Sequence, residues 1–279
     1  MKTISIVLPI YNEGDRIYRA FKALESYRAP RGITVETVRF VDDGSQDNTA
    51  RQVRAWIKAI VKKKRYLPIQ SVLRHASIEL VSYRKNRGRG YAVRQGAKGF
   101  TSDYMLYLDA DMSIPLRNLK QCIPYMQEGI DCIAGSKKIK GTVALHKGSW
   151  LRGFVGKAHT QLLQFVLGVN FYDFTGGFKL FSKELYTDIF PKLCLDRWGF
   201  DPEIIYVAQS NGYTLKEVPI VWSHVSTSSK VQLVRDITWA LGEMVAIRIN
   251  DLLGKYSRKE KSALINWMGN ERIVYNKGL

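Results

Sequence analysis

Short apolar runs alternate with segments of helical periodicity along the first half of the chain. Five runs bounded by turn residues predict buried strands, over residues 4–10, 37–41, 78–83, 104–109 and 131–136. Between these runs, apolar residues recur every three or four positions, as they do in a helix that covers a sheet. Because the runs are predominantly apolar and do not alternate regularly with polar residues, we expect both faces of the sheet to be buried. The pattern predicts an α/β fold with a mostly parallel central sheet flanked by helices.

The second half of the chain has a less regular pattern. A strand that the chain enters through a pair of glycines is expected at 174–182. The long helix expected over 230–256 has its apolar residues on one face. The predicted elements are helices over 149–168, 201–211, 230–256 and 259–268, and strands over 174–182 and 215–222. We expect one domain over residues 1–225, with a helical extension over 226–279 that packs on it.

Polar residues follow four of the predicted strands. In open parallel sheets, ligands bind outside the carboxyl ends of the strands, so these residues are expected to converge at one edge. The segments that follow the four strands are Pro9 to Glu13, Asp42 to Ser45, Arg84 to Gly90, and Asp109 to Asp111.

Asp109 and Asp111 are separated only by Ala110, so their negative charges repel each other. A divalent cation would offset this repulsion, and Mg²⁺ in proteins is commonly held by one or two carboxylates together with substrate phosphates. A turn that opens the next helix could also place aspartates here. The position at the end of a fourth buried strand favours the metal.

Two further segments allow a structural and a functional interpretation. Asp42 and Asp43 fit a turn closed by aspartate side chains, or carboxylates that bind a base or ribose. The segment RKNRGRG at 84–90 could contact RNA. Because it opens a helix within the alternating pattern, a small anionic ligand suits it better.

The chain is strongly basic, with a formal net charge of +18. Such an excess attracts polyanions, including nucleic acid, anionic lipid headgroups and phosphorylated substrates, and charge alone does not choose among them. No apolar run approaches the roughly 20 residues that span a bilayer. We therefore expect a soluble or peripherally membrane-bound protein in the cytoplasm.

The segments IVLPIYNE, VDDGSQDNT, KNRGRGYAVRQG and YLDADMS, in this order and spacing, resemble the nucleotide-sugar domain of the inverting GT-A glycosyltransferases of family 2. The resemblance covers residues 1–225 and implies the Rossmann-like GT-A fold. Further along, AGSKKIKG, DFTGGFKLFSKE, RWGFDPEIIYVAQSNGY and KEVPIVW are similar to the dolichyl-phosphate glucose and mannose synthase subgroup. The Q-x-x-R-W motif of processive synthases is incomplete, since position 194 is Cys194.

The resemblance implies a role for each matching position on the donor side. Asp109 and Asp111 would hold Mg²⁺ or Mn²⁺ on the diphosphate of UDP-glucose or GDP-mannose. Arg89 stands where the subgroup usually has lysine, which replaces a point charge by a planar fork. The residues expected to bind the nucleotide sugar are Pro9, Tyr11, Glu13, Asp42, Asp43, Lys85, Asn86, Arg89, Asp109 and Ala110.

The resemblance also implies an acceptor side. Ser136, Lys137, Lys138 and Arg152 match the segment that binds the phosphate of a polyprenyl or dolichyl acceptor. Asp201 occupies the place of a catalytic base in many relatives. It could take the proton of a hydroxyl acceptor, or orient a phosphate acceptor, which is already anionic. Asp111 and Asp201 are the candidate catalytic residues.

The expected function is hexose transfer to a polyprenyl or dolichyl phosphate at the cytoplasmic face of a membrane. Docking would use the net positive charge and the 230–256 helix with Trp239, and a separate membrane-protein partner is compatible with this scheme. Within the fold, the alternative is transfer to a glycan or small-molecule hydroxyl, with Asp201 as the base. Outside this class of enzyme, the alternatives are a nucleic-acid-binding module and a catalytically silent scaffold. The expected function itself involves no nucleic acid.

Overall fold

The computed structural model describes residues 1–146, 150–223 and 233–257, with the side chains of 150–155 and 233–240 left aside. Its strands are β1 (Lys2–Ile10), β2 (Ile33–Asp42), β3 (Ser77–Ser82), β4 (Tyr104–Leu108), β5 (Cys132–Ser136), β6 (Val143–Ala144), β7 (Phe178–Ser182), β8 (Leu215–Pro219) and β9 (Val221–Trp222). Its α-helices are α1 (Tyr18–Ser26), α2 (Thr49–Lys63), α3 (Arg89–Ala97), α4 (Leu119–Gln127), α5 (Trp150–Leu167), α6 (Lys183–Ile189), α7 (Phe200–Ser210) and α8 (Leu233–Leu252).

Seven strands form one sheet in the order β3-β2-β1-β4-β7-β5-β8. Only β7 runs antiparallel to its neighbours, β4 and β5, within the described sheet. The mostly parallel sheet predicted from the apolar runs is therefore confirmed. The predicted strand over 174–182 is β7, which begins at Phe178, directly after the glycine pair. Because β7 separates β4 from β5 while reversing direction, β4 and β5 point the same way. Their carboxyl ends lie at one edge of the sheet, together with those of β1, β2 and β3.

The predicted strand over 215–222 is two strands. Residues Leu215 to Pro219 pair with β5 in the main sheet, while Val221 and Trp222 pair with β6 in a separate two-stranded sheet. Pro219 has no amide hydrogen, so it cannot donate to a continuing ladder. The change of partner at this proline carries the chain from the main sheet to the small one.

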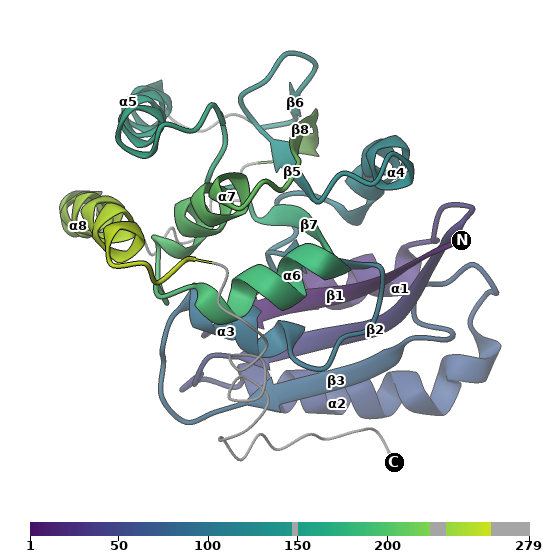
Figure 1. Cartoon of the computed structure of the whole chain (residues 1–279). Coiled ribbons are helices and arrows are strands. Elements are labelled where there is room, and N and C mark those ends of the chain that lie inside the picture. The colour runs from purple at the N-terminus through teal and green to yellow at the C-terminus, as the bar shows by residue number, and fades with distance from the viewer. Residues whose placement is uncertain (147–149, 224–232, 258–279) are drawn as a thin grey trace.

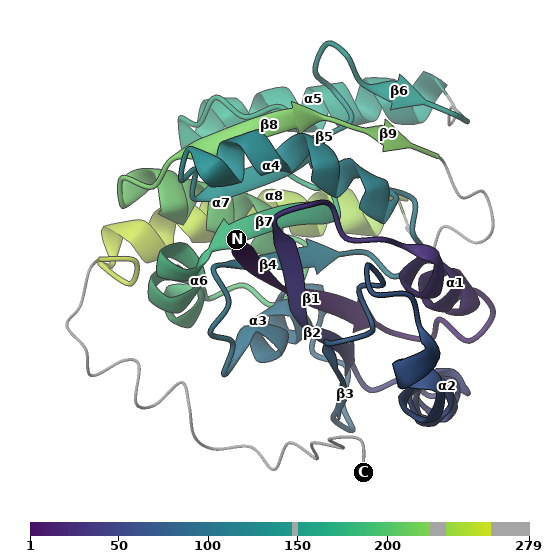
Figure 2. The same cartoon turned by 90° about the vertical axis from the view of Figure 1, so that its right-hand side faces the viewer.

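Helices cover both faces of the sheet (Figures 1 and 2). In β4, Leu106 joins the core beneath α1, α2 and α4, while Met105 and Tyr107 join the core shared with α3, α6, α7 and α8. Successive side chains of a strand point to opposite faces, so a sheet with two apolar cores requires strands that are mostly apolar at successive positions. This requirement explains the apolar runs seen in the sequence, and the buried charges Arg39 and Glu79 within them are paired with each other at 2.7 Å.

The last described helix, α8, packs against α5 and α7. It begins at Leu233 and ends at Leu252, within the predicted span of 230–256. The helix predicted over 259–268 and the side chain of Trp239 lie outside what the structure describes. Within the described residues, we find no helix with the length and hydrophobicity needed to cross a membrane.

Candidate functional site

The polar segments that follow β1, β2, β3 and β4 come together at one edge of the sheet, as the sequence predicts. The register of the strands pairs Ile10 with Asp42, and Asp42 with Ser82, so the three strands end nearly level. The loop after β1 contacts the loop after β2, since the Asn12 amide donates to Ser45 Oγ at 2.9 Å and Asn12 Oδ1 accepts from the Gln46 amide at 2.8 Å.

The Asp43 carboxylate joins the loops after β2 and β3. It accepts hydrogen bonds from Asn86 Nδ2 at 2.7 Å and from the amides of Arg87 and Gly88, both at 2.8 Å. Burial raises the pKa of Asp43, and these backbone donors oppose that shift. The Asp42 carboxylate accepts from the Ser45 amide at 3.0 Å, which is the predicted aspartate-closed turn. Both acids therefore shape the loops at this edge of the sheet.

Position 88 requires a glycine because of its backbone conformation and because another segment of the chain lies against it. Its φ is +115°, and a Cβ atom there would lie 2.5 Å from the carbonyl oxygen of Asp196. The glycine-rich turn after β3 thus accommodates the segment that precedes α7. Lys85, on the same turn, is exposed.

Glu13 follows β1 and is held by an ion pair with Arg16. Its amide donates to Thr49 Oγ1, the first residue of α2, at 2.7 Å. The pKa of Arg16 is raised, first by the hydrogen bond from its guanidinium to Glu13, and further by the charges of Asp111 and Asp109. Arg16 therefore brings a positive charge toward the two aspartates, a role that sequence reasoning missed.

Asp109 and Asp111 follow β4 on a tightly turned segment. Asp109 Oδ1 accepts from the Tyr107 hydroxyl at 3.0 Å, and Asp111 Oδ1 accepts from the Ser113 amide at 2.9 Å. The next helical turn begins only at Leu116, so neither aspartate is a helix N-cap. Asp111 closes a local turn, and each carboxylate keeps oxygen lone pairs beyond these single bonds.

The second glycine before β7 makes room for Asp109. A Cβ atom at Gly177 would lie 1.8 Å from Asp109 Oδ2, and the Asp109 amide donates to the Gly177 carbonyl at 3.0 Å. Any side chain at this position would displace the carboxylate. The glycine pair noted in the sequence is therefore part of the site.

Side chains of alternating charge form a network that ends at Asp109. Asp201 is fully buried and pairs through Oδ1 with Lys179 Nζ at 2.7 Å and through Oδ2 with the Arg89 guanidinium. Arg89 in turn lies 3.9 Å from Asp109, measured from Nη1 to Oδ1. Burial lowers the pKa of Arg89, but Asp201, Tyr107 and Asp109 raise it by more, and the net shift is upward. Arg89 is therefore a fixed cation beside Asp109.

Lys179 is a second residue that sequence reasoning missed. It is fully buried in β7, and its ammonium also donates to the Gly176 carbonyl at 2.6 Å. A buried lysine requires an ionic partner and satisfied hydrogen bonds. The signal was available, since Lys179 interrupts the apolar run FKLFS of a predicted buried strand.

Trp198 lies over the Arg89 guanidinium, 5.3 Å from the ring centroid, and is 41% exposed. Its loop is held on three sides: Arg94 pairs with Asp196, the Leu195 amide donates to Glu203 at 2.9 Å, and the Gly199 amide donates to Glu243 of α8 at 2.7 Å. A half-exposed aromatic ring thus flanks the cation next to Asp109.

Basic residues follow β5 at the same edge of the sheet. Ser136 is buried at the end of β5, and its hydroxyl accepts from the Lys138 amide at 3.3 Å. The Lys137 amide donates to Asp173 at 2.8 Å, and its ammonium lies 5.2 Å from the centroid of the Trp222 ring. The Lys138 ammonium donates to α5, at the Gly156 carbonyl and Thr160 Oγ1. The Arg152 side chain lies outside what the structure describes.

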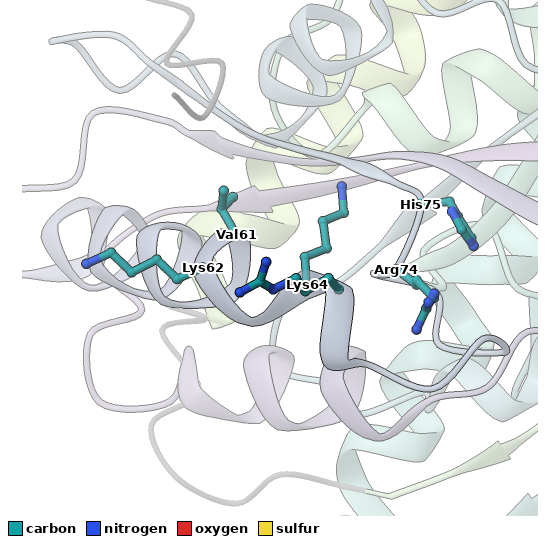
Figure 3. Close-up of a pocket in the computed structure, with 6 residues that line it drawn as sticks. Val61, Lys62, Lys64, Arg74 and His75 are labelled. Carbon is teal, nitrogen blue, oxygen red and sulfur yellow. The ribbon is translucent and has the colours of Figure 1, made fainter.

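Five basic residues from the end of α2 and from the segment between α2 and β3 line a pocket together with Val61: Lys62, Lys64, Arg65, Arg74 and His75 (Figure 3). Because His75 precedes the amino end of β3, this pocket lies at the edge of the sheet opposite to the polar segments described above. The Lys64 ammonium donates to the Ala76 carbonyl at 2.6 Å, and the Arg74 guanidinium donates to the Leu67 carbonyl. In Figure 3 the labelled Lys62 and Arg74 side chains point in different directions. The lining of this pocket contains basic residues and Val61 but no acidic residue, unlike the opposite edge.

The donor set at Asp109 and Asp111 fits a hard divalent cation. Two carboxylates supply oxygen ligands of the kind that Mg²⁺ and Mn²⁺ prefer, and a diphosphate and water can complete the coordination. In the described part of the chain, no group of three or more histidine, cysteine or acidic side chains is placed to hold a metal ion.

Comparison with known proteins identifies relatives over most of the chain. Residues 5–190 match the sequence profile of "Glycosyl transferase family 2". The chain is 30% identical over 271 residues to the dolichyl-phosphate beta-glucosyltransferase of Saccharomyces cerevisiae, covering 92% of this chain and 78% of that one. It is 29% identical over 273 residues to the protein of the same name from Dictyostelium discoideum, covering 92% and 77%.

Solved structures share the fold at lower sequence identity. Glucosyl-3-phosphoglycerate synthase from Mycobacterium tuberculosis, in complex with UDP, superposes with a TM-score of 0.60 at 16% identity, covering 93% of this chain and 82% of that one. Mannosyl-3-phosphoglycerate synthase from Rubrobacter xylanophilus gives a TM-score of 0.62 at 19% identity, covering 94% and 78%. The mycobacterial enzyme has also been crystallised with Mn²⁺, UDP-glucose and phosphoglyceric acid.

Proposed function

The chain belongs to glycosyl transferase family 2, and from this premise we propose that it transfers glucose from UDP-glucose to the phosphate of a polyprenyl or dolichyl lipid. The relatives named above are dolichyl-phosphate beta-glucosyltransferases, and they align with nearly the whole chain. The sequence motifs are also compatible with GDP-mannose as the donor. We favour UDP-glucose because these relatives are glucosyltransferases.

The donor would lie across the carboxyl ends of β1 to β4. We assign the base and ribose to Pro9, Tyr11 and Glu13, together with the loop that Asp42 and Asp43 shape. The diphosphate would lie between Lys85, Asn86 and Arg89 on one side and Asp109 to Asp111 on the other. The fixed cation Arg89, 3.9 Å from Asp109, supports this assignment, since it faces the position where charge builds up on the leaving diphosphate.

Asp109 and Asp111 would hold Mg²⁺ or Mn²⁺ on the donor diphosphate. When bound, such an ion neutralises negative charge on the departing nucleoside diphosphate. The protein itself supplies further positive charge, from Arg16, whose pKa the charges of Asp111 and Asp109 help to raise, and from Arg89, 3.9 Å from Asp109.

The burial of Asp201 is the observation that carries the choice of a phosphate acceptor. Both of its carboxylate oxygens are engaged, by Lys179 and Arg89, and the residue has no exposed surface. A base for a hydroxyl acceptor must reach the proton that it removes. A phosphate monoester is already ionised and requires cations instead. We propose that Asp201 positions Arg89, and that the residues after β5 receive the acceptor phosphate.

On the acceptor side, Ser136, Lys137, Lys138 and Arg152 are the proposed phosphate-binding residues. Two contacts support this assignment. The turn around Asp173, which accepts from the Lys137 amide, leads directly to Gly177 beside Asp109. Lys138 is tied to α5. The acceptor oxygen could therefore approach the sugar from the β5 side while the diphosphate leaves toward Arg89. Because the lipid is confined to a bilayer, we propose peripheral attachment at the cytoplasmic face.

The acceptor assignment is tested by replacing both Lys137 and Lys138 with alanine. We expect the KM for a polyprenyl phosphate in detergent to rise at least about tenfold, with the KM for UDP-glucose nearly unchanged, because two charge-assisted contacts to one phosphate are lost. The control is Lys58→Ala with Lys62→Ala, which removes two charges from exposed positions of α2. Equal loss toward donor and acceptor would refute the assignment. Transfer to sugar hydroxyls instead would favour Asp201 as the base.

A further inference from the structure

The described part of α8 exposes an apolar face. Between Leu241 and Leu253, every large exposed side chain except Arg248 is apolar. Leu252 is 83% exposed and Val245 55% exposed, and they lie on one side of the helix. The opposite side, with Met244 and Ile247, is buried in the core. The helix is therefore apolar on both sides, which is unusual at a protein surface.

The neighbouring helix α5 extends this apolar surface. Phe165 is 87% exposed, and Leu162 is partly exposed one turn earlier. The two helices pack against each other, and Figure 1 shows both on the same side of the molecule, remote from α2. We name this surface the α5/α8 face, consisting of Leu162, Phe165, Leu241, Val245, Ile249, Leu252 and Leu253.

The charges around the α5/α8 face are divided by sign. Within the part of α8 whose side chains the structure describes, both acidic residues turn toward the protein, since Glu243 accepts from the Gly199 amide and Asp251 accepts from the Tyr206 hydroxyl. The basic residues Lys157, Arg248 and Lys255 are exposed, while Glu243 and Asp251 are only partly so. Arg248 and Lys255 each also donate one hydrogen bond within the protein, to the Tyr206 hydroxyl and to Asn250 Oδ1, both at 2.8 Å. An apolar surface with exposed cations at its margin complements an anionic lipid bilayer, whose headgroups attract lysine and arginine while its hydrocarbon receives the apolar side chains.

We propose that the α5/α8 face docks on an anionic bilayer. This inference rests on the proposed function and adds to it the surface by which the enzyme meets its lipid substrate. The connection to the site is direct, because α5 receives hydrogen bonds from the ammonium of Lys138, one of the proposed acceptor cations. Docking through α5 brings these cations toward the headgroup level, where the phosphate of a polyprenyl lipid lies.

The experiment measures sedimentation of the full chain with phosphatidylcholine vesicles, with and without phosphatidylglycerol. The test variant is Val245→Glu with Leu252→Glu. The control is Tyr66→Glu with Ile69→Glu, which adds the same charge at comparably exposed apolar positions that follow α2 in the chain. We expect the control to match wild type on anionic vesicles. The test variant should bind at least about tenfold more weakly, since it places two carboxylates against hydrocarbon.

A second measurement reports what covers the face. Leu252→Cys carries an environment-sensitive fluorophore in a Cys194→Ser background, because Cys194 is exposed while Cys122 and Cys132 are buried. A blue shift that requires anionic vesicles supports the proposal. A blue shift already present in buffer overturns it, because protein then covers the face, whether a second copy or another part of this chain. Equal vesicle binding by test and control variants, or no binding by wild type, also overturns it.

Failure of docking is kept separate from failure of the proposed function by assaying all variants in detergent. Transfer to a short-chain polyprenyl phosphate in detergent does not require a bilayer. If the test variant retains this activity while losing vesicle binding, docking alone has been removed. If wild type shows no transfer in detergent, the proposed function fails whatever the vesicle result.

Discussion

At the scale of single residues, the site depends on a buried carboxylate with two cationic partners. Asp201 and Lys179 are both fully buried and 2.7 Å apart, and Arg89 extends the network to Asp109. Taking two charges out of water is costly, so such a pair is weak evidence for stability, and we attribute its presence to the geometry that it fixes. Here that geometry is the orientation of Arg89.

Removing the negative charge from this network is predicted to destabilise the fold. Asp201→Asn leaves Lys179 buried without its ionic partner, which costs about 3–5 kcal/mol in the free energy of unfolding. Adding Lys179→Met to that variant should recover most of the loss while transfer stays low, because Arg89 remains unoriented. Denaturant unfolding of the two variants measures the recovery. A double variant as unstable as Asp201→Asn would refute the pairing.

Asp111→Asn is predicted to abolish metal-dependent transfer and leave the fold intact. Asp111 is partly exposed and has one local hydrogen bond, so stability should change by less than about 0.5 kcal/mol. Transfer should fall at least about a hundredfold, because the cation on the diphosphate loses one of its two protein ligands. The thermal shift that Mn²⁺ produces in the presence of UDP should disappear as well. Asp15→Asn, at an exposed position, is the control, and wild-type turnover in Asp111→Asn would exclude the metal role.

At the scale of elements, the loop over 193–199 connects α3, α7 and α8. Glu203, buried in the first turn of α7, accepts from the amides of Cys194 and Leu195 at 2.8 and 2.9 Å and from the Tyr256 hydroxyl at 2.6 Å. This carboxylate holds the loop that carries Trp198. The loop therefore keeps its position above Arg89 without regular secondary structure.

Glu203→Gln is predicted to lower stability and alter its pH dependence. An amide cannot accept all three hydrogen bonds, and an unsatisfied buried donor costs about 1–3 kcal/mol. Burial raises the pKa of Glu203, so the folded state binds its proton more tightly than the unfolded state. The contribution of Glu203 is then full below the ordinary glutamate pKa and declines as pH rises through the raised one. Melting temperatures of wild type and variant across the acidic range should converge as pH increases. A constant or widening difference would contradict the raised pKa.

The sequence predicted the parallel sheet because its strands must be apolar on both faces, as in Ile4 to Ile10. It predicted the convergence at one sheet edge because strand direction follows from the alternation with helices. It did not predict the break between β8 and β9, although the run over 215–222 contains Pro219, which cannot donate to a continuing ladder. The partners of Asp201, Glu203 and Gly88 were also beyond reach, because they join segments distant in the chain through tertiary contacts alone.

At the scale of the whole molecule, the basic residues are spread over regions that differ in how many acidic side chains lie near them. At the carboxyl ends of the strands, Arg16 and Arg89 are paired with acids, whereas the pocket between the end of α2 and β3 is lined by basic residues and Val61. The net charge of +18 predicts attraction to polyanions in general. Recognition of one of them depends on the convergence of β1 to β5 at a single edge.

Donor binding is predicted to stabilise the entire fold selectively. A ligand that binds only the folded state at a hundredfold excess over its Kd adds about 2.7 kcal/mol, enough to raise the melting temperature by several degrees. UDP-glucose with Mn²⁺ should produce this shift, and GDP-mannose with Mn²⁺ should not. The reverse preference would reassign the sugar and the nucleotide while retaining the fold and the donor edge.

The most direct test of the central claim is a transfer assay in detergent with Mn²⁺ or Mg²⁺, a polyprenyl phosphate, and radiolabelled UDP-glucose and GDP-mannose in parallel. Our account predicts that label from UDP-glucose enters the lipid phase and that chelation of the metal stops it. Metal-dependent hydrolysis of UDP-glucose with no labelled lipid would retain the donor site and contradict the phosphate acceptor. Absence of both reactions would contradict the proposed function.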